Sequence, residues 1–248
     1  MGRHASHYHM VAADMIGSSR FLRDNRDELY KIVLDDFYKM VRSTQLALSK
    51  KYRFIEKDRL AGIYPIGGDS FWMFVPASRE DKIVEDSFSF TTNVIHNIKK
   101  EFTLRFNVYG LGIRIGVHTT VKEKMADGST GWVNIDEGVG KLKKDEVYKM
   151  PLFNRIFSRD FVVARRLEQA SQEKIFASNI LFSKEFVHRM IDYGGISSSR
   201  RIDQKIHIKL KDGSKLVFAR RFVPEVATET IREKLEECRV NEFYEFVS

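Results

Sequence analysis

Apolar residues follow two different periodicities along the chain, and the changes between them predict its first elements. Apolar residues recur at helical spacing from Asp27 to about Lys50 and again over Ile83–Phe102. Short apolar or alternating runs predict strands over His7–Met15, Leu60–Ile66, Phe71–Val75 and Leu111–His118. The resulting order is βαββαβ. It is typical of a ferredoxin-like α+β fold, in which an antiparallel sheet carries both helices on one face.

The second half of the chain has weaker patterns. Residues 119–151 are rich in glycine and charge without a sustained period, so we expect an insertion or long loop there. The following elements are a helix over Ser158–Ser171, a strand over Lys174–Ala177, a helix over Ser183–Ile191 opened by a serine cap, a hairpin of Gln204–Leu210 and Lys215–Phe222, and a helix over Thr228–Val240. We expect one domain over residues 1–225 and a C-terminal helical tail over residues 226–248.

Composition narrows the class of protein. Hydrophobic residues make up 43% and charged residues 31%, which is ordinary globular usage. The single cysteine, Cys238, excludes an intramolecular disulfide and a cysteine-rich zinc site, and it fits a reducing cytoplasm. No apolar run approaches the roughly 18 residues of a membrane span, so we expect a cytoplasmic protein with no membrane association.

The net charge of +8 could indicate a nucleic-acid partner, but acidic residues are interleaved with the basic ones. We therefore expect no nucleic-acid partner. A small polyanion such as a nucleotide suits a basic cleft better.

Two aspartates are candidates for chemistry. Asp14 ends the first predicted strand, directly before Gly17, Ser18 and Ser19, and Asp69 lies on the tip of the predicted hairpin. In a βαββαβ sheet the first strand neighbours the hairpin, so the two carboxylates are expected side by side. Adjacent carboxylates repel unless cations lie between them, and hard oxygen ligands suit Mg²⁺ or Mn²⁺. The turn after Asp14 would present backbone amides to a phosphate.

Four segments, in order, resemble the motifs of class III adenylyl and guanylyl cyclases. They are Val11–Ser19, Gly68–Phe74, Gly112–His118 and Val163–Leu167. The resemblance covers residues 11–167. It implies a metal-dependent nucleotide cyclase, in which two divalent cations, Mn²⁺ or Mg²⁺, are held by Asp14, Asp69 and the Met15 carbonyl.

The resemblance also implies roles for other residues. The amides of Gly17, Ser18 and Ser19 would contact the phosphates. Arg166 matches the arginine that stabilises the transition state, although a surface arginine on a helix is the alternative. Lys211 is the best match to a triphosphate-binding lysine. Family members form head-to-tail homodimers in which the aspartates of one subunit face the arginine of the other.

Some positions depart from the purine cyclases. Arg155 and Ile63 stand where those enzymes carry base-reading residues, nearby Tyr64 could narrow the base pocket, and Val162 replaces a catalytic asparagine. Arginine can donate to the O2 carbonyl of a pyrimidine. The chain is most similar to the bacterial Pycsar pyrimidine cyclases, which make cyclic UMP or cyclic CMP. That resemblance implies antiphage defence through a separate effector protein activated by the cyclic nucleotide, with UTP favoured over CTP as substrate.

Three alternatives stay open. A pseudo-cyclase would bind nucleotide without turnover, for which Val162 is the main argument. A diguanylate-cyclase-like enzyme is suggested by Gly67–Phe71, which differs by one residue from the GGDEF signature, but Met15–Phe21 lacks that family's second pattern. A nucleic-acid-binding ferredoxin-like domain lacks support from an aromatic strand signature.

Overall fold

The computed structural model describes residues 8–51, 62–66, 68–79, 82–83, 85–120, 122–124, 130–132, 159–193, 196–210 and 213–247. The elements are β1 (Tyr8–Ile16), α1 (Ser18–Asp24), α2 (Asp27–Lys51), β2 (Gly62–Ile66), β3 (Ser70–Pro76), β4 (Ser78–Arg79), β5 (Lys82–Ile83), α3 (Glu85–Phe106), η1 (Asn107–Tyr109), β6 (Gly112–Thr119), β7 (Lys122–Lys124), β8 (Thr130–Trp132), α6 (Arg159–Ala170), β9 (Ile180–Ser183), α7 (Lys184–Tyr193), β10 (Ile196–Ile202), β11 (Lys205–Leu210), β12 (Lys215–Phe222), η3 (Val223–Glu225), α8 (Glu229–Glu237) and β13 (Glu242–Phe246).

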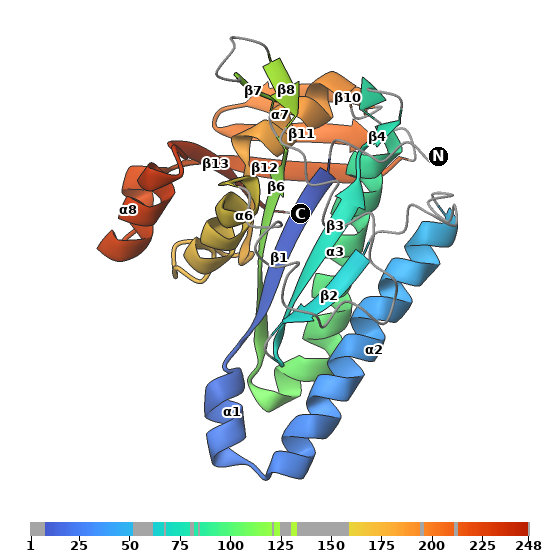
Figure 1. The fold of residues 1–248 in the computed structure, drawn as a ribbon, viewed down its shortest axis with the longest axis vertical. Coiled ribbons are helices and arrows are strands. Elements are labelled where there is room, and N and C mark those ends of the chain that lie inside the picture. Colours follow the sequence, from blue (N-terminus) through green and yellow to red (C-terminus); the bar gives the residue numbers. More distant parts are fainter. Residues whose placement is uncertain are drawn as a thin grey trace.

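A nine-stranded sheet in the order β10-β11-β12-β13-β9-β6-β1-β3-β2 organises these elements (Figure 1). β1 lies between β6 and β3, as the βαββαβ order predicts, and it pairs with both in antiparallel register. The predicted antiparallel core is confirmed, because β6, β1, β3 and β2 are antiparallel neighbours throughout. Outside that core, β6 and β9 are parallel neighbours, so the complete sheet is mixed. The reason is that α6 connects β6 to β9 as a crossover, which parallel pairing requires.

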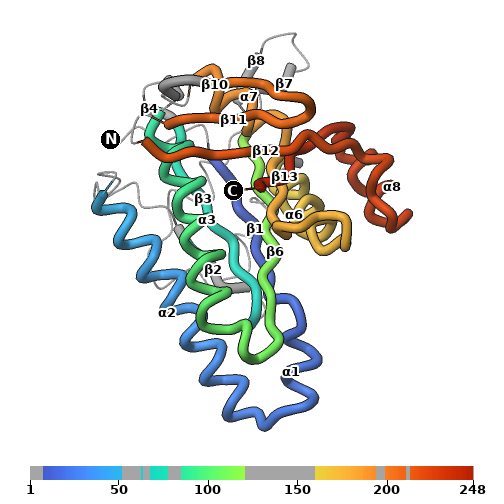
Figure 2. Tube along the Cα trace, turned by 180° about the vertical axis from the view of Figure 1, so that it is seen from behind, coloured from blue at the N-terminus to red at the C-terminus, as the bar shows by residue number. Residues whose placement is uncertain are grey.

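Helices cover both faces of the sheet (Figure 2). The main core lies between the sheet and α2, α3 and α7, and it contains Val11, Ala13 and Met15 of β1. Phe37 of α2 is fully buried there, and each such ring contributes about 1.5–3 kcal/mol by leaving water. A second cluster packs α6 and α8 against the opposite face, through Phe243 among others. β1 is therefore buried on both faces, and Asp14 points to the side of α6.

Most of the predicted elements are confirmed, with ends shifted by a few residues. α2 and α3 share one face, the β11–β12 hairpin forms, and the predicted serine cap is present, because the Ser183 hydroxyl accepts the amide of Phe186 at 3.2 Å. The strand predicted over Lys174–Ala177 was wrong: those residues form turns, and the strand is β9. The amides of Ala177 and Ser178 instead donate to the Glu245 carboxylate.

Besides β9, two strands of the nine-stranded sheet were not predicted, and neither were the short pairs β4–β5 and β7–β8. β10 adds an outer strand beside β11, and β13 inserts between β12 and β9 inside the sheet. The expected tail of residues 226–248 therefore contains a helix, α8, but it is not purely helical. The domain division at residue 225 stays a prediction. None of the described helices is long and apolar enough to cross a membrane.

Candidate metal and nucleotide site

The register of β1 and β3 brings the two candidate aspartates together. Asp14 pairs with Ser70, the first residue of β3, so Asp69, which directly precedes Ser70, lies just beyond this pair at the tip of the hairpin. The amide of Met15 donates to the carbonyl oxygen of Asp69 at 3.0 Å, which fixes the hairpin tip against β1. Gly68 has a φ of 95°, a left-handed conformation that glycine adopts without steric cost.

The charges of both carboxylates reach the same neighbouring side chain. Burial, and then the negative charges of Asp69 and Asp14, raise the pKa of the Tyr30 phenol. Asp69 also accepts a hydrogen bond from the hydroxyl of Ser18, which lies within 3.4 Å of the Met15 carbonyl oxygen. The carboxylates thus form one negatively charged site beside the turn that follows β1.

That turn depends on a glycine. Gly17 has a φ of 87°, and a Cβ at this position would lie 3.3 Å from the carbonyl oxygen of Gly110. The residue therefore provides both the left-handed turn and the space for a close approach. α1 begins immediately afterwards, with Ser18 buried and Ser19 exposed. The first amides of a helix lack acceptors within it, so they are available to other groups.

Arg114 of β6 belongs to this site, although its role was not predicted from the sequence. Strand alternation places it on the α6 face, opposite Asp14 in the β1–β6 register. Its Nε donates to Asp14 Oδ2 at 3.1 Å, and Nη2 donates to the same oxygen. Nη1 donates to the side-chain oxygen of Gln172. The pairing of Arg114 with Asp14 is largely sheltered from water, with side chains 17% and 12% exposed.

A third carboxylate, Glu168 of α6, lies on the other side of Arg114. It is fully buried, forms ion pairs with Arg114 and Arg165, and accepts a hydrogen bond from Arg165. Burial raises the pKa of Glu168 to about 7, against the two arginines, which lower it. The position of α6 depends on Gly116, because a Cβ there would overlap the Ala164 carbonyl oxygen and the Glu168 amide nitrogen.

The donors at this site fit a divalent cation. Asp14 and Asp69 supply carboxylate oxygens and Met15 supplies a carbonyl oxygen, the hard ligands that Mg²⁺ and Mn²⁺ prefer. Within the described part of the chain, no group of three or more His, Cys, Asp or Glu side chains could hold a metal. Two carboxylates suffice for Mg²⁺, which usually keeps several waters and takes further oxygens from substrate phosphates.

Arg166 does not join the aspartates within one chain. The residues of α6 that face the sheet include Ala164, Leu167 and Glu168, whereas Arg166 lies on the half-exposed side and donates to the side-chain oxygen of Gln169 at 2.7 Å. Val162 is on the same half-exposed side. Neither residue faces Asp14 from its own subunit.

The predicted base-reading residues are only partly described. Ile63 is half-buried and packs against the main core, paired with Met73 of β3. Tyr64 pairs with Trp72 through the backbone. Arg155 and Lys211 lie outside the described residues, as does most of the expected insertion, of which β7 and β8 are described. The substrate roles of these residues therefore stay predictions.

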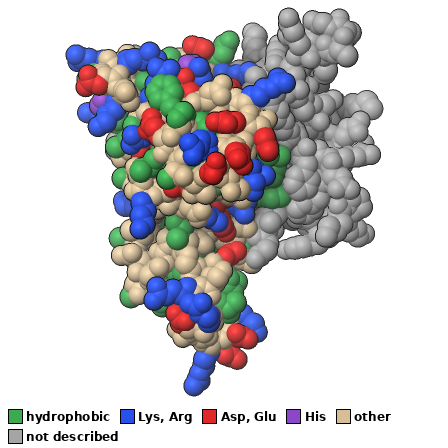
Figure 3. Space-filling model, turned by 90° about the vertical axis from the view of Figure 1, so that its left-hand side faces the viewer, with side chains coloured by type: hydrophobic (Ala, Val, Ile, Leu, Met, Phe, Trp, Pro, Cys, Tyr) green, Lys and Arg blue, Asp and Glu red, His purple; other side chains and the backbone are tan. Residues whose placement is uncertain are grey.

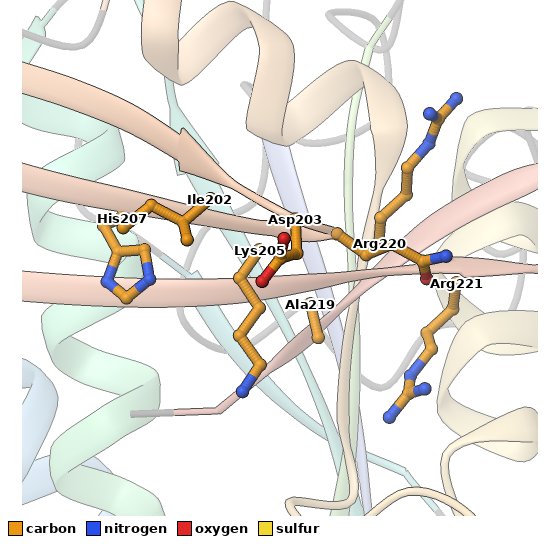
Figure 4. Close-up of a pocket in the computed structure, with 8 residues that line it drawn as sticks. Ile202, Asp203, Lys205, His207, Ala219, Arg220 and Arg221 are labelled. Atoms are coloured by element: carbon orange, nitrogen blue, oxygen red, sulfur yellow. The ribbon is translucent and has the colours of Figure 1, made fainter.

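A pocket of about 450 Å³ lies far from these aspartates in the sheet, on β10, β11 and β12 (Figure 4). Its two arginines are already paired: Arg220 binds Glu242 through two hydrogen bonds, and Arg221 binds Glu245. Figure 3 shows the side of the molecule on which α8 lies, where basic and acidic side chains are interspersed over the described part.

Comparison with known proteins bears on the fold. No protein-family model matches the chain, and no curated protein matches it. Among solved structures, the adenylyl cyclase CyaB from P. aeruginosa has a TM-score of 0.51 and 15% identity, over 98% of this chain and 94% of that chain.

Two guanylyl cyclase domains resemble the chain less closely. That of RhGC from Catenaria anguillulae, in complex with GTP, has a TM-score of 0.48 and 13% identity, over 100% of this chain and 99% of that one. A dimeric domain of the RhoGC fusion protein from Blastocladiella emersonii has a TM-score of 0.41 and 14% identity, over 79% and 88%. At such low identity the likeness to CyaB concerns the fold alone: the chain has the α+β fold of class III nucleotidyl cyclase domains.

Proposed function

We propose that this chain is a metal-dependent pyrimidine nucleotide cyclase that converts UTP or CTP to cyclic UMP or cyclic CMP and pyrophosphate. The observation that carries the proposal is the juxtaposition of Asp14 and Asp69 beside the turn at Gly17, on the fold of a nucleotidyl cyclase. The strand order and the turn pattern of the sequence predicted that Asp14, Asp69 and the turn at Gly17 lie close together.

The reaction needs one bond formed and one broken. The ribose 3′-oxygen attacks the α-phosphorus, its proton leaves, and the bond from the α-phosphorus to the bridging oxygen breaks, so that pyrophosphate departs. Divalent cations, Mn²⁺ or Mg²⁺, held by Asp14, Asp69 and the Met15 carbonyl would lower the pKa of the 3′-hydroxyl and neutralise the departing pyrophosphate. The amides of Ser18 and Ser19 would position the phosphates.

The arginine at the transition state would come from a second subunit. Arg166 lies on the half-exposed side of α6, away from Asp14 of its own chain. This placement supports a head-to-tail homodimer, in which Arg166 of the partner subunit neutralises charge that grows on the phosphoryl oxygens. The loss of one such donor typically costs about 10²- to 10³-fold in rate.

Specificity for a pyrimidine rests on the resemblance and on the departures from purine cyclases. Ile63 contacts the main core and offers no polar group to a base edge. Arg155 would donate to the O2 carbonyl of uracil or cytosine, Tyr64 would narrow the base pocket, and Lys211 would bind the triphosphate. By the same resemblance the product is a second messenger of antiphage defence, which activates a separate effector protein.

Incubation with each of ATP, GTP, CTP and UTP in the presence of Mn²⁺ or Mg²⁺ tests the proposal, with products identified by mass spectrometry. We expect a cyclic pyrimidine monophosphate that disappears in Asp14→Ala. A cyclic purine product would retain the cyclase and refute the assignment of the base. The absence of any cyclic product, with nucleotide binding retained, would favour a pseudo-cyclase, in line with Val162.

A further inference from the structure

Arg114 stands between two carboxylates that belong to different elements. Asp14 comes from β1 and Glu168 from α6, and the guanidinium is within ion-pair distance of both. The side chain of Gln172, in the turn that follows α6, accepts a hydrogen bond from the remaining nitrogen, Nη1. A small reorientation of the Arg114 side chain can therefore exchange Asp14 for Glu168 as its main partner.

The hydrogen bonds around Arg114 are unevenly divided. Both Nε and Nη2 donate to Asp14, whereas the buried Glu168 Oε1 forms an ion pair with Nε but accepts no hydrogen bond from the residues that the structure describes. Buried acceptors without a donor are rare, because they lose hydration without compensation. Glu168 is fully buried, and the backbone of α6 at this residue lies directly against Gly116 of β6. The buried oxygen thus already contacts the guanidinium of Arg114 without accepting a hydrogen bond from it.

On the basis of the proposed function, we infer that Arg114 is an internal counter-ion that occupies Asp14 until a divalent cation binds, and that Glu168 is the positioning residue that receives Arg114 afterwards. Without a cation, Arg114 offsets the repulsion between Asp14 and Asp69. A cation at Asp14 would repel the guanidinium at short range, and Glu168 Oε1 is the acceptor next to it. Glu168 therefore acts on the metal site through Arg114.

Mn²⁺ binding without nucleotide, measured by electron paramagnetic resonance at pH 8, tests this exchange. Arg114→Gln frees Asp14, so we expect Mn²⁺ to bind about tenfold more tightly or better, a change of roughly 1.4 kcal/mol. Glu168→Gln removes the receiving carboxylate, so we expect binding about tenfold weaker. The double variant should bind as tightly as Arg114→Gln alone, because Glu168 has no effect once Arg114 is absent.

The double variant distinguishes a movement of Arg114 from Asp14 to Glu168 from independent electrostatic effects of the two charges on the metal site. If the two charges act independently, their effects add, and the double variant returns to wild-type affinity; that result would overturn the inference. Equal loss of affinity in both single variants would also overturn it, since a purely structural role predicts that outcome. Near-ultraviolet circular dichroism establishes that each variant is folded.

Two further variants complete the experiment. Arg105→Gln removes an exposed guanidinium that pairs with Asp36 and Glu101, and it should leave Mn²⁺ affinity unchanged. Asp14→Asn should abolish tight binding. If the Asp14→Asn variant binds Mn²⁺ as tightly as the wild type, the proposed metal site is wrong, and this inference is wrong with it. Asp14-dependent binding combined with additive charge effects would refute the exchange alone.

Discussion

Asp69 has a backbone role and a side-chain role that one substitution separates. Its carbonyl oxygen accepts the amide of Met15, which holds the hairpin to β1, while its carboxylate adds negative charge next to Asp14. Asp69→Asn keeps the first role and removes the charge. We expect Mn²⁺-dependent turnover to fall by about 10²-fold or more, because the cations lose a charged ligand.

The fold of this variant should survive, since the apo protein loses a repulsion between like charges. Urea unfolding should show a free energy equal to that of the wild type or slightly higher. Asp35→Asn is a matched control, because Asp35 is an exposed carboxylate paired with Lys39 on α2. Full activity in Asp69→Asn, as in the control, would mean that Asp69 is not a metal ligand.

Glu168 should make stability depend on pH. Its pKa is raised to about 7 by burial, from an ordinary value of 4.5. A carboxyl group with a raised pKa in the folded state stabilises the fold at low pH, and this contribution is lost as pH rises towards about 7. We expect a loss on the order of 3 kcal/mol at most between about pH 4.5 and pH 8.

Glu168→Gln isolates this group, because every other titrating residue is common to both proteins. The difference in free energy of unfolding between the variant and the wild type, measured in urea at several pH values, should change in favour of the variant as pH rises. A difference that is constant over this range would contradict the raised pKa.

The aspartates could be predicted from the sequence, but the network around them could not. Asp14 and Asp69 each stand next to a strong local signal, a turn or a hairpin, and the strand order brings them together. Arg114 and Glu168 carry no such signal, since their contact depends on how closely α6 approaches β6. Alternation along Leu111–His118 does place Arg114 with Gly116 on one face, which was the available clue.

Among the elements, periodicity identified the long helices and failed for short strands. α2 buries Val33, Phe37, Met40 and Val41 at helical spacing, which no strand pattern reproduces. Residues 174–177 and 180–183 are both short apolar runs, and only tertiary pairing with β6 and β13 selects the second as a strand. β13 follows a helix rich in charge, and it contains two glutamates, Glu242 and Glu245, which are not typical of a buried strand. They are buried in the structure because they pair with Arg220 and Arg221.

The packing of α6 on β6 depends on Gly116, which has no side chain. Gly116→Ala would place a Cβ on the backbone of Ala164 and Glu168, which cannot move without shifting the helix. We expect the free energy of unfolding to fall by about 1–3 kcal/mol or more, as for other overpacked cores. Chemical denaturation measures this loss.

Gly112→Ala is the matched control on the same strand and the same face. Its Cβ would lie 3.4 Å from the Cβ of Ile16, a tight contact with a side chain and not with backbone. We expect a change smaller than about 1 kcal/mol. Equal destabilisation by both alanines would show that the close approach of α6 is not what Gly116 serves.

At the scale of the whole molecule, the predicted catalytic groups of one chain do not meet at one site. Asp14 and Arg114 face each other between β1 and α6, whereas Arg166 is turned to the half-exposed side of α6. The sequence motifs could identify Asp14 and Arg166, but they could not indicate that these two side chains face different directions. The proposed sharing of the site between two subunits would resolve this separation.

Mixing two inactive variants tests the shared site. In a head-to-tail dimer of one Asp14→Ala and one Arg166→Ala subunit, one site carries both defects and the other carries neither. Random exchange makes half of the dimers mixed, so we expect activity to recover to about a quarter of the wild-type value. Each variant alone should stay inactive at every concentration. A site built within one chain would be damaged in every subunit, so mixing would restore no activity. Mixed dimers that are verified by mass spectrometry and show no recovery would therefore rule out a site shared between subunits.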